Sequence, residues 1–212
     1  MSGIHDLALF IAAGFLLNLT PGPDMTYIAA RSVAGGFRDG SAATFGITAG
    51  CVVHTIAAAA GLSALLATSA MAFEIVKWCG AAYLLYAGIR LIVGSARKGQ
   101  PGNVQRFIMP ARPARIFREA FIINVFNPKV ALFFLAFLPQ FIAADAPAKT
   151  LAFLALGCLF NFNSLFVNLP VAWLASRAGR GLRGSAGAAR WLSRVVGGIF
   201  VLLAARLATF ER

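Results

Sequence analysis

Long apolar blocks separated by short polar connections make up most of the chain. The blocks of spanning length are residues 5–28, 42–66, 73–93, 119–141, 150–174 and 191–209. A transmembrane helix needs about 20 mostly apolar residues, whereas membrane β-strands alternate over about ten. Because backbone groups in lipid must be hydrogen-bonded within the protein, the pattern predicts an all-α integral membrane protein with six transmembrane helices.

Basic residues gather in alternate connections, which predicts the orientation of the spans. The first, third and fifth connections carry Arg31 and Arg38, then Arg97, Lys98, Arg106, Arg112, Arg115 and Arg118, then Arg177, Arg180, Arg183, Arg190 and Arg194. The second and fourth connections have only Lys77 and Lys149. Since cytoplasmic connections carry the excess of Lys and Arg, both termini are predicted to lie outside.

The middle of the chain contains a basic segment rich in Gly and Pro, residues 96–116, which reads as a cytoplasmic linker between halves at about 1–95 and 117–212. Each half has three spans, so equivalent halves would be oppositely oriented in the membrane. The first span of each half carries an Asn followed by a proline. We therefore predict a single transporter domain, 1–212, built as a 3+3 inverted repeat with broken helices 1 and 4.

The composition of the chain excludes a soluble domain and argues against a nucleic-acid-binding protein. Apolar residues make up 59% of the 212 positions and charged residues 12%, against roughly 45–50% and about 25% in soluble domains. The net charge of +12 would suit nucleic acid, but the basic residues lie between apolar blocks and leave no separate solvated face. The expected partner is the lipid bilayer, and no nucleic acid is expected.

The first break is the segment Asn18-Leu-Thr20-Pro21-Gly22-Pro23-Asp24. Its two prolines remove backbone donors and force the helix to kink or stop. The freed carbonyls need partners, which Asn18, Thr20 or a bound ligand would supply. Two interpretations fit Asp24: it caps the helical segment that follows, or it is a proton or ammonium site, because a carboxylate at this depth is costly unless it has a function or a partner.

The second break carries Asn124, Asn127, Pro128 and Lys129. Lys129 has two interpretations: its ammonium snorkels to the headgroups, or it is buried and pairs with Asp24 across the interface between the halves. Broken helices at corresponding positions of two halves indicate a transporter's substrate site near the midplane. The sequence therefore predicts one site formed by both breaks.

Other polar groups lie within the spans. His54 shares the second span with Gly46, Gly50 and Gly61, where small residues permit close helix approach, and it serves either as hydrogen-bonding glue or as part of a proton path. The fifth span carries four polar side chains without an assigned role: Asn161, Asn163, Ser164 and Asn168.

Enzyme signatures are missing from the sequence, which has no His/Glu cluster, nucleophile elbow or Walker loop. It predicts neither a catalytic centre nor a metal or cofactor site, so that pumping would depend on an ion gradient, most simply of protons. A passive channel, a lipid scramblase and a membrane-embedded enzyme are the competing classes. The Gly-rich spans would pack either within one chain or between two, so a homo-oligomer stays open.

Four blocks in chain order, residues 18–31, 46–54, 80–88 and 124–141, resemble the LysE/RhtB family of amino-acid exporters. The resemblance implies export from the bacterial cytoplasm through the inner membrane, driven by the proton-motive force. Asp24 after Pro-Gly-Pro resembles the homoserine, threonine and leucine branch more than the exporters of basic amino acids. In this reading the substrate's carboxylate meets helix-start amides or Lys129, its ammonium meets Asp24 or the freed carbonyls, and proton exchange at Asp24 resets the carrier.

Overall fold

The computed structural model describes residues 3–20, 22–62, 111–143 and 145–178, with isolated positions between 71 and 93 and at 201. These parts are helical, and they contain no strand apart from one bridge between Ile4 and Ile142. The α-helices are α1 (Leu7–Leu19), α2 (Pro23–Ala57), α5 (Pro113–Val125), α6 (Pro128–Leu132) and α7 (Lys149–Ala178). A π-helical turn, η1 (Ala58–Leu62), continues α2, and η3 (Phe133–Phe137) and η4 (Leu138–Phe141) continue α6.

Helix α2 is two helical segments joined at Gly36. This glycine has a φ of 76° and a ψ of −170°, a conformation that residues with a Cβ rarely adopt. A Cβ on Gly40 would overlap Ser32, so the chain turns back tightly there. The interrupted helix α2 therefore contains the second part of the predicted span 5–28 and the whole described part of span 42–66. Gly36 connects the two.

The prediction that Arg31 lies in the connection between the first two spans is wrong. The helix that begins at Pro23 continues past Arg31 to the turn at Gly36, and Arg31 is only 4% exposed. Arg38, which follows the turn, is exposed as expected.

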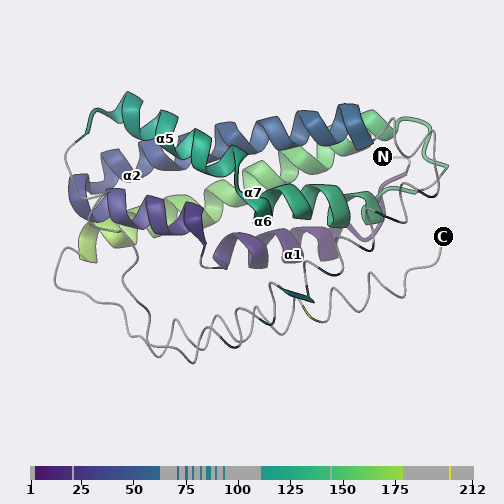
Figure 1. Ribbon diagram of the computed structural model, residues 1–212, viewed down its shortest axis with the longest axis horizontal. Coiled ribbons are helices and arrows are strands. Elements are labelled where there is room, and N and C mark those ends of the chain that lie inside the picture. Colours follow the sequence, from purple (N-terminus) through teal and green to yellow (C-terminus); the bar gives the residue numbers. More distant parts are fainter. Residues whose placement is uncertain are drawn as a thin grey trace.

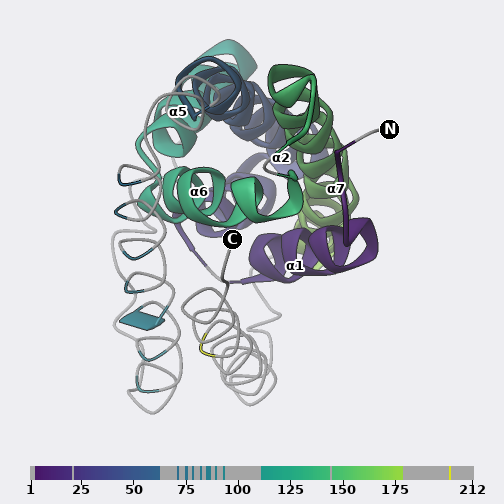
Figure 2. The same cartoon turned by 90° about the vertical axis from the view of Figure 1, so that its right-hand side faces the viewer.

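Helix α2 packs against α7, with α5 against α2 and α1 against α7 (Figures 1 and 2). Gly46 and Gly50 let α2 approach α5 closely, because a Cβ on either residue would overlap Phe117 or Asn124. No described atom lies within 4 Å of the Cβ position of Gly61, so close helix approach at Gly61 stays a prediction.

Two apolar clusters hold the helices together. The larger joins α1 to η3, η4 and α7 through contacts between phenylalanine rings, including Phe133 with Phe160, tilted at a centroid separation of 4.8 Å, and Phe137 with Phe141, edge to face at 4.9 Å. The smaller joins both parts of α2 to α5 and α7 and consists of Tyr27, Ile28, Ala43, Ile47, Ile116, Ala120 and Ala172. Large apolar side chains also face outward, such as Phe126 at 79% and Phe166 at 60% exposed, as expected of surfaces in contact with lipid.

Several predicted spans have counterparts in the described residues. By length and composition Pro23–Gly61 and Lys149–Arg177 are long enough to cross a membrane, and Pro113–Val125 with Pro128–Phe141 forms a pair bent by 47° that matches the predicted broken fourth span. Spans 73–93 and 191–209, apart from isolated positions, and residues 96–110 of the linker lie outside the described ranges. The six-helix count and the inverted repeat therefore stay predictions.

The described helices have two distinct ends. Figure 1 shows the turn of α2, the start of α5 and the end of α7 together at the left, and the N-terminus at the right. At the N-terminal end, main-chain hydrogen bonds join His5 N to Phe141 O at 3.1 Å and Ala143 N to Gly3 O at 2.8 Å. The N-terminus therefore lies beside the connection between η4 and α7.

Candidate functional site

The first helix break has the form that its sequence predicts. Helix α1 ends at Leu19, and α2 begins at Pro23 after Gly22 in extended conformation. The Thr20 hydroxyl donates to the Leu16 carbonyl at 2.8 Å, which also accepts from the Thr20 main-chain N at 3.1 Å, so this hydroxyl does not serve the carbonyls that the break frees. Pro23 takes the first helical position, where its missing N–H costs nothing. Pro21 lies outside the described residues.

Lys129 reaches across to this break. Its Nζ donates to the Leu17 and Thr20 carbonyls, each at 3.1 Å. A Cβ on Gly22 would lie 3.3 Å from Nζ, so the absence of a side chain there lets the lysine come close to the backbone. The interpretation of Lys129 as a side chain that snorkels to the headgroups is wrong, because its ammonium is bound inside the bundle.

Asp24 lies in the first turn of α2 and is 9% exposed. It is not the helix cap, because Gly22 occupies that position and no side chain caps the helix. Its Oδ2 accepts a hydrogen bond from Asn124 Nδ2 at 2.9 Å. Asp24 is within electrostatic range of Lys129, but within the described ranges the two form no direct ion pair, so Asn124 takes the place expected for Lys129.

Two buried asparagines, Asn124 and Asn127, make the hydrogen bonds at the second break. Asn124 lies in the last turn of α5 and is 1% exposed, while Asn127 caps α6 and is 2% exposed. Asn127 Oδ1 accepts from the Lys129 main-chain N at 3.0 Å, and Pro128 opens α6. This cap orients the helical turn that carries Lys129 toward the end of α1, which lies beside α6 in Figures 1 and 2.

His54 also belongs to this cluster. Its Nε2 lies 3.1 Å from the Asn124 carbonyl oxygen, and its ring centroid is 6.0 Å from that of Phe134. That carbonyl also accepts from the Asn127 main-chain N at 2.9 Å, so the His54 tautomer that carries its hydrogen on Nε2 donates a second hydrogen bond to it. This geometry favours the interpretation of His54 as hydrogen-bonding glue between α2 and α5.

Four buried polar atoms at the breaks have no hydrogen-bond partner in the described part of the chain. Two are amide donors, Asn18 Nδ2 and Asn127 Nδ2, and two are acceptors, Asp24 Oδ1 and Asn124 Oδ1. Buried polar groups are nearly always paired, because leaving one unpaired costs about 1–3 kcal/mol. The breaks therefore offer both donors and acceptors to a ligand.

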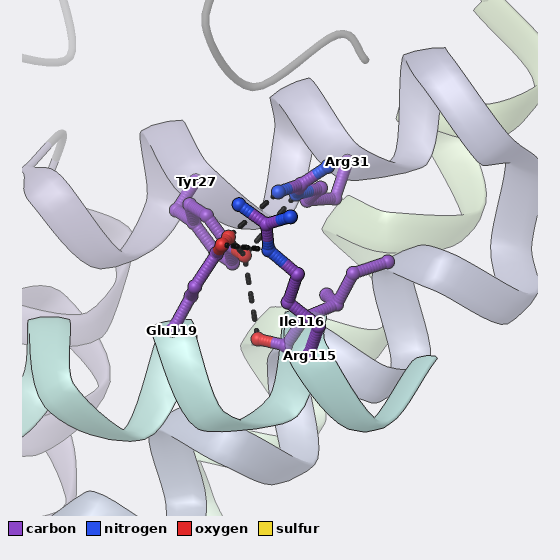
Figure 3. A network of polar contacts seen from close by, with 5 residues as sticks. All are labelled: Tyr27, Arg31, Arg115, Ile116 and Glu119. Carbon is purple, nitrogen blue, oxygen red and sulfur yellow. Dashed lines mark hydrogen bonds and ion pairs between the residues drawn. The ribbon is translucent and has the colours of Figure 1, made fainter. Parts of the chain in front are cut away.

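Sequence reasoning missed a second polar cluster, formed by Tyr27 and Arg31 of α2 with Arg115 and Glu119 of α5 (Figure 3). Arg31 Nη2 and the Tyr27 hydroxyl each contact Glu119 Oε2 at 2.7 Å, and Arg31 Nε donates to the Tyr27 oxygen at 3.1 Å. Arg115 Nε binds Glu119 Oε1 at 2.8 Å. The signal was present: both pairs on one helix are spaced i, i+4, and Glu119 is an acid within a basic segment.

Two of the four polar side chains of the fifth span join helices. Asn163 Nδ2 donates to the Ile11 carbonyl of α1 at 2.9 Å, and Asn161 Nδ2 donates to Thr55 Oγ1 of α2 at 3.2 Å. Ser164 bonds within α7 to the Asn161 carbonyl. These bonds attach α7 to both sides of the first break without reaching the Asp24–Asn124 pair.

Comparison with known proteins bears on the whole chain. The family model described as LysE type translocator matches residues 15–210. The chain belongs to this family. The two-break cluster therefore lies in a LysE-type translocator, a membrane transport protein and not an enzyme.

Curated relatives cover nearly all of this translocator. It is 30% identical over 200 residues to a homoserine/homoserine lactone efflux protein of Salmonella typhi, covering 94% of each chain. It is 29% identical over 214 residues to a leucine efflux protein of Salmonella choleraesuis (strain SC-B67), covering 99% of this chain and 97% of the relative. No solved structure matches the chain.

Proposed function

We propose that this translocator exports neutral amino acids, such as threonine, homoserine or leucine, from the bacterial cytoplasm. Two relatives that align along nearly their whole length are named efflux proteins for homoserine and for leucine. The chemistry of the two breaks supports the same class of substrate.

The observation that carries the proposal is the set of unpaired atoms at the breaks. An α-amino acid presents an ammonium with three donors and a carboxylate that only accepts. Asp24 Oδ1 and Asn124 Oδ1 suit the ammonium, while Asn18 Nδ2 and Asn127 Nδ2 suit the carboxylate. The positive end of the α2 dipole at the first break favours the carboxylate as well. A zwitterion would pair donors and acceptors that the protein leaves open.

Proton coupling at Asp24 extends the proposal. Asp24 is buried at the start of α2 and holds Asn124 of the opposite break. An intramembrane carboxylate is favoured only when it has a partner or takes up a proton. Binding of the substrate ammonium would provide the partner in one state, and a proton from outside would replace it in the returning state.

The test is efflux from proteoliposomes loaded with a panel of radiolabelled amino acids, with and without an imposed pH gradient. We expect saturable efflux of neutral amino acids that the gradient accelerates, and little efflux of lysine or arginine. Liposomes without protein give the background. Efflux that fails to saturate would indicate a channel, and preference for the basic amino acids would contradict the neutral substrate class.

A further inference from the structure

The ammonium group of Lys129 is held by main-chain oxygens. Within the described part of the chain it has no carboxylate in ion-pair contact, and its Nζ donates to the carbonyls of Leu17 and Thr20. These carbonyls stand at the end of α1, where the break removes intrahelical donors and the helix dipole is negative. We refer to them below as the carbonyl pair.

The carbonyl pair suits any primary ammonium, not only that of a lysine. The α-ammonium of an amino acid carries the same three N–H donors as Lys129. Gly22 leaves room beside Nζ, and the unpaired Asp24 Oδ1 belongs to the same break. Lys129 thus occupies a place that is chemically right for the substrate's own ammonium.

Building on the proposed function, we propose that Lys129 is a tethered competitor of the substrate. Its ammonium occupies the carbonyl pair when the site has no substrate, and the ammonium of the incoming amino acid displaces it. At the carbonyls the displacement is a balanced exchange, because two N–H···O bonds from one ammonium are replaced by two from another. The Leu17 carbonyl also accepts from the Thr20 main-chain N at 3.1 Å, so the exchange matters most for the Thr20 carbonyl, which would otherwise lose its donor at a cost in free energy.

Three roles for Lys129 predict different effects of its removal on substrate binding. A competitor weakens the binding of anything with an ammonium, so its removal tightens that binding. A ligand for the substrate carboxylate strengthens binding, so its removal weakens it. If Lys129 only holds α6 against α1, it stabilises the fold, so its removal changes the binding of all ligands equally.

The experiment measures binding to purified wild type and Lys129→Met with three probes: L-leucine, 3-methylbutylamine, which lacks the carboxylate, and 4-methylpentanoate, which lacks the ammonium. We expect leucine and the amine to bind at least about tenfold more tightly to Lys129→Met, the scale of a lost competing charged hydrogen bond. Binding of 4-methylpentanoate should not tighten. Lys149→Met, the same chemical change at the start of α7, should leave all three unchanged.

The outcomes separate the two proposals. Weaker leucine binding by Lys129→Met, or equal changes with all three probes, would overturn the displacement even if wild-type export is intact. Failure of the wild type to bind or export any neutral amino acid would overturn the proposed function and, with it, the displacement.

A measurement on the wild-type protein keeps the test decisive if Lys129→Met does not fold. Reductive dimethylation of Lys129, followed by mass spectrometry, reports how accessible its Nζ is. Saturating L-leucine should raise the rate of modification at Lys129, because the substrate releases it from the carbonyl pair, while the rate at Lys149 stays constant. Protection, or no change at Lys129, would contradict the displacement.

Discussion

At the scale of single residues, the two helix breaks are joined by only a few polar contacts. Asn124 Nδ2 holds Asp24, and Lys129 Nζ holds the end of α1. His54 meets the carbonyl of the same Asn124 from α2. Each contact uses a group that the broken backbone either exposes or positions, so a change of one side chain acts directly on the site.

Asp24→Asn tests the coupling role of the carboxylate. Asparagine keeps the size of Asp24 and an oxygen that can accept from Asn124, but it can neither carry a charge nor exchange a proton. We expect the acceleration of efflux by a pH gradient to be lost, with leucine binding weakened at least about tenfold because one charged hydrogen bond is missing. Efflux from proteoliposomes and equilibrium binding measure the two effects.

The control for Asp24→Asn is Asp145→Asn, at an exposed position between η4 and α7. It makes the same chemical change away from the breaks and should behave as wild type. If Asp24→Asn retained full acceleration by the gradient, another group would have to carry the proton.

At the scale of elements, close backbone contact and a buried ion pair both contribute to the packing of α2 against α5. Gly46 and Gly50 bring the helix backbones close together, and Arg31 crosses the interface to Glu119 at 2.7 Å. The Arg31 side chain is 5% exposed and that of Glu119 29%. A buried charge that loses its partner is costly, whereas an exposed pair contributes little. The α2–α5 interface should therefore depend on Arg31 far more than on Arg115.

Substitution of Glu119 by Gln should destabilise the protein by about 1–3 kcal/mol, less than the 3–5 kcal/mol of fully buried pairs because Glu119 is partly exposed. The double variant Arg31→Met/Glu119→Gln should recover part of this loss, which a double-mutant cycle would measure from unfolding in detergent. Arg115→Met, whose side chain is 68% exposed, should cost at most about 1 kcal/mol. Equal effects of Arg31→Met and Arg115→Met would refute the role of burial.

At the scale of the whole molecule, the arrangement of the ends agrees with the alternation of basic residues. The turn of α2, the start of α5 and the end of α7 share one end in Figure 1, and these are the connections rich in arginine. Ile4, near the N-terminus, pairs with Ile142 at the other end. We infer that the arginine-rich end is cytoplasmic and that the N-terminus lies outside.

Cysteine labelling checks this orientation. In a variant without native cysteines, a cysteine at Ser95 should react with an impermeant maleimide only in inside-out vesicles, and one at Ala144 only in intact cells. Both positions lie outside the described residues and belong to the predicted third and fourth connections. Labelling of both from the same side would rule out the six-span layout.

Much of the candidate site was predictable because proline acts locally. Pro23 and Pro128 each start a helix in the structure where the sequence predicts a break, since proline cannot continue the helix that precedes it. Asn18, Asp24, Asn124 and Asn127 were recognisable as polar groups in apolar spans. Their partners were not, because Asn124 and Asp24 are 100 positions apart and a choice among several polar partners depends on packing.

The sequence by itself determined the apolar spans, the two breaks and the alternation of charge, because each follows from the local chemistry of lipid, proline and arginine. Only the tertiary structure decided that Asp24 binds Asn124, that Lys129 binds the carbonyls of α1, and that Arg31 lies buried against Glu119. These choices arise from how closely the glycine face of α2 approaches α5 and from the 47° bend between α5 and α6. Distance and direction across helices select the partner, and neither is encoded in the spacing of residues along one helix.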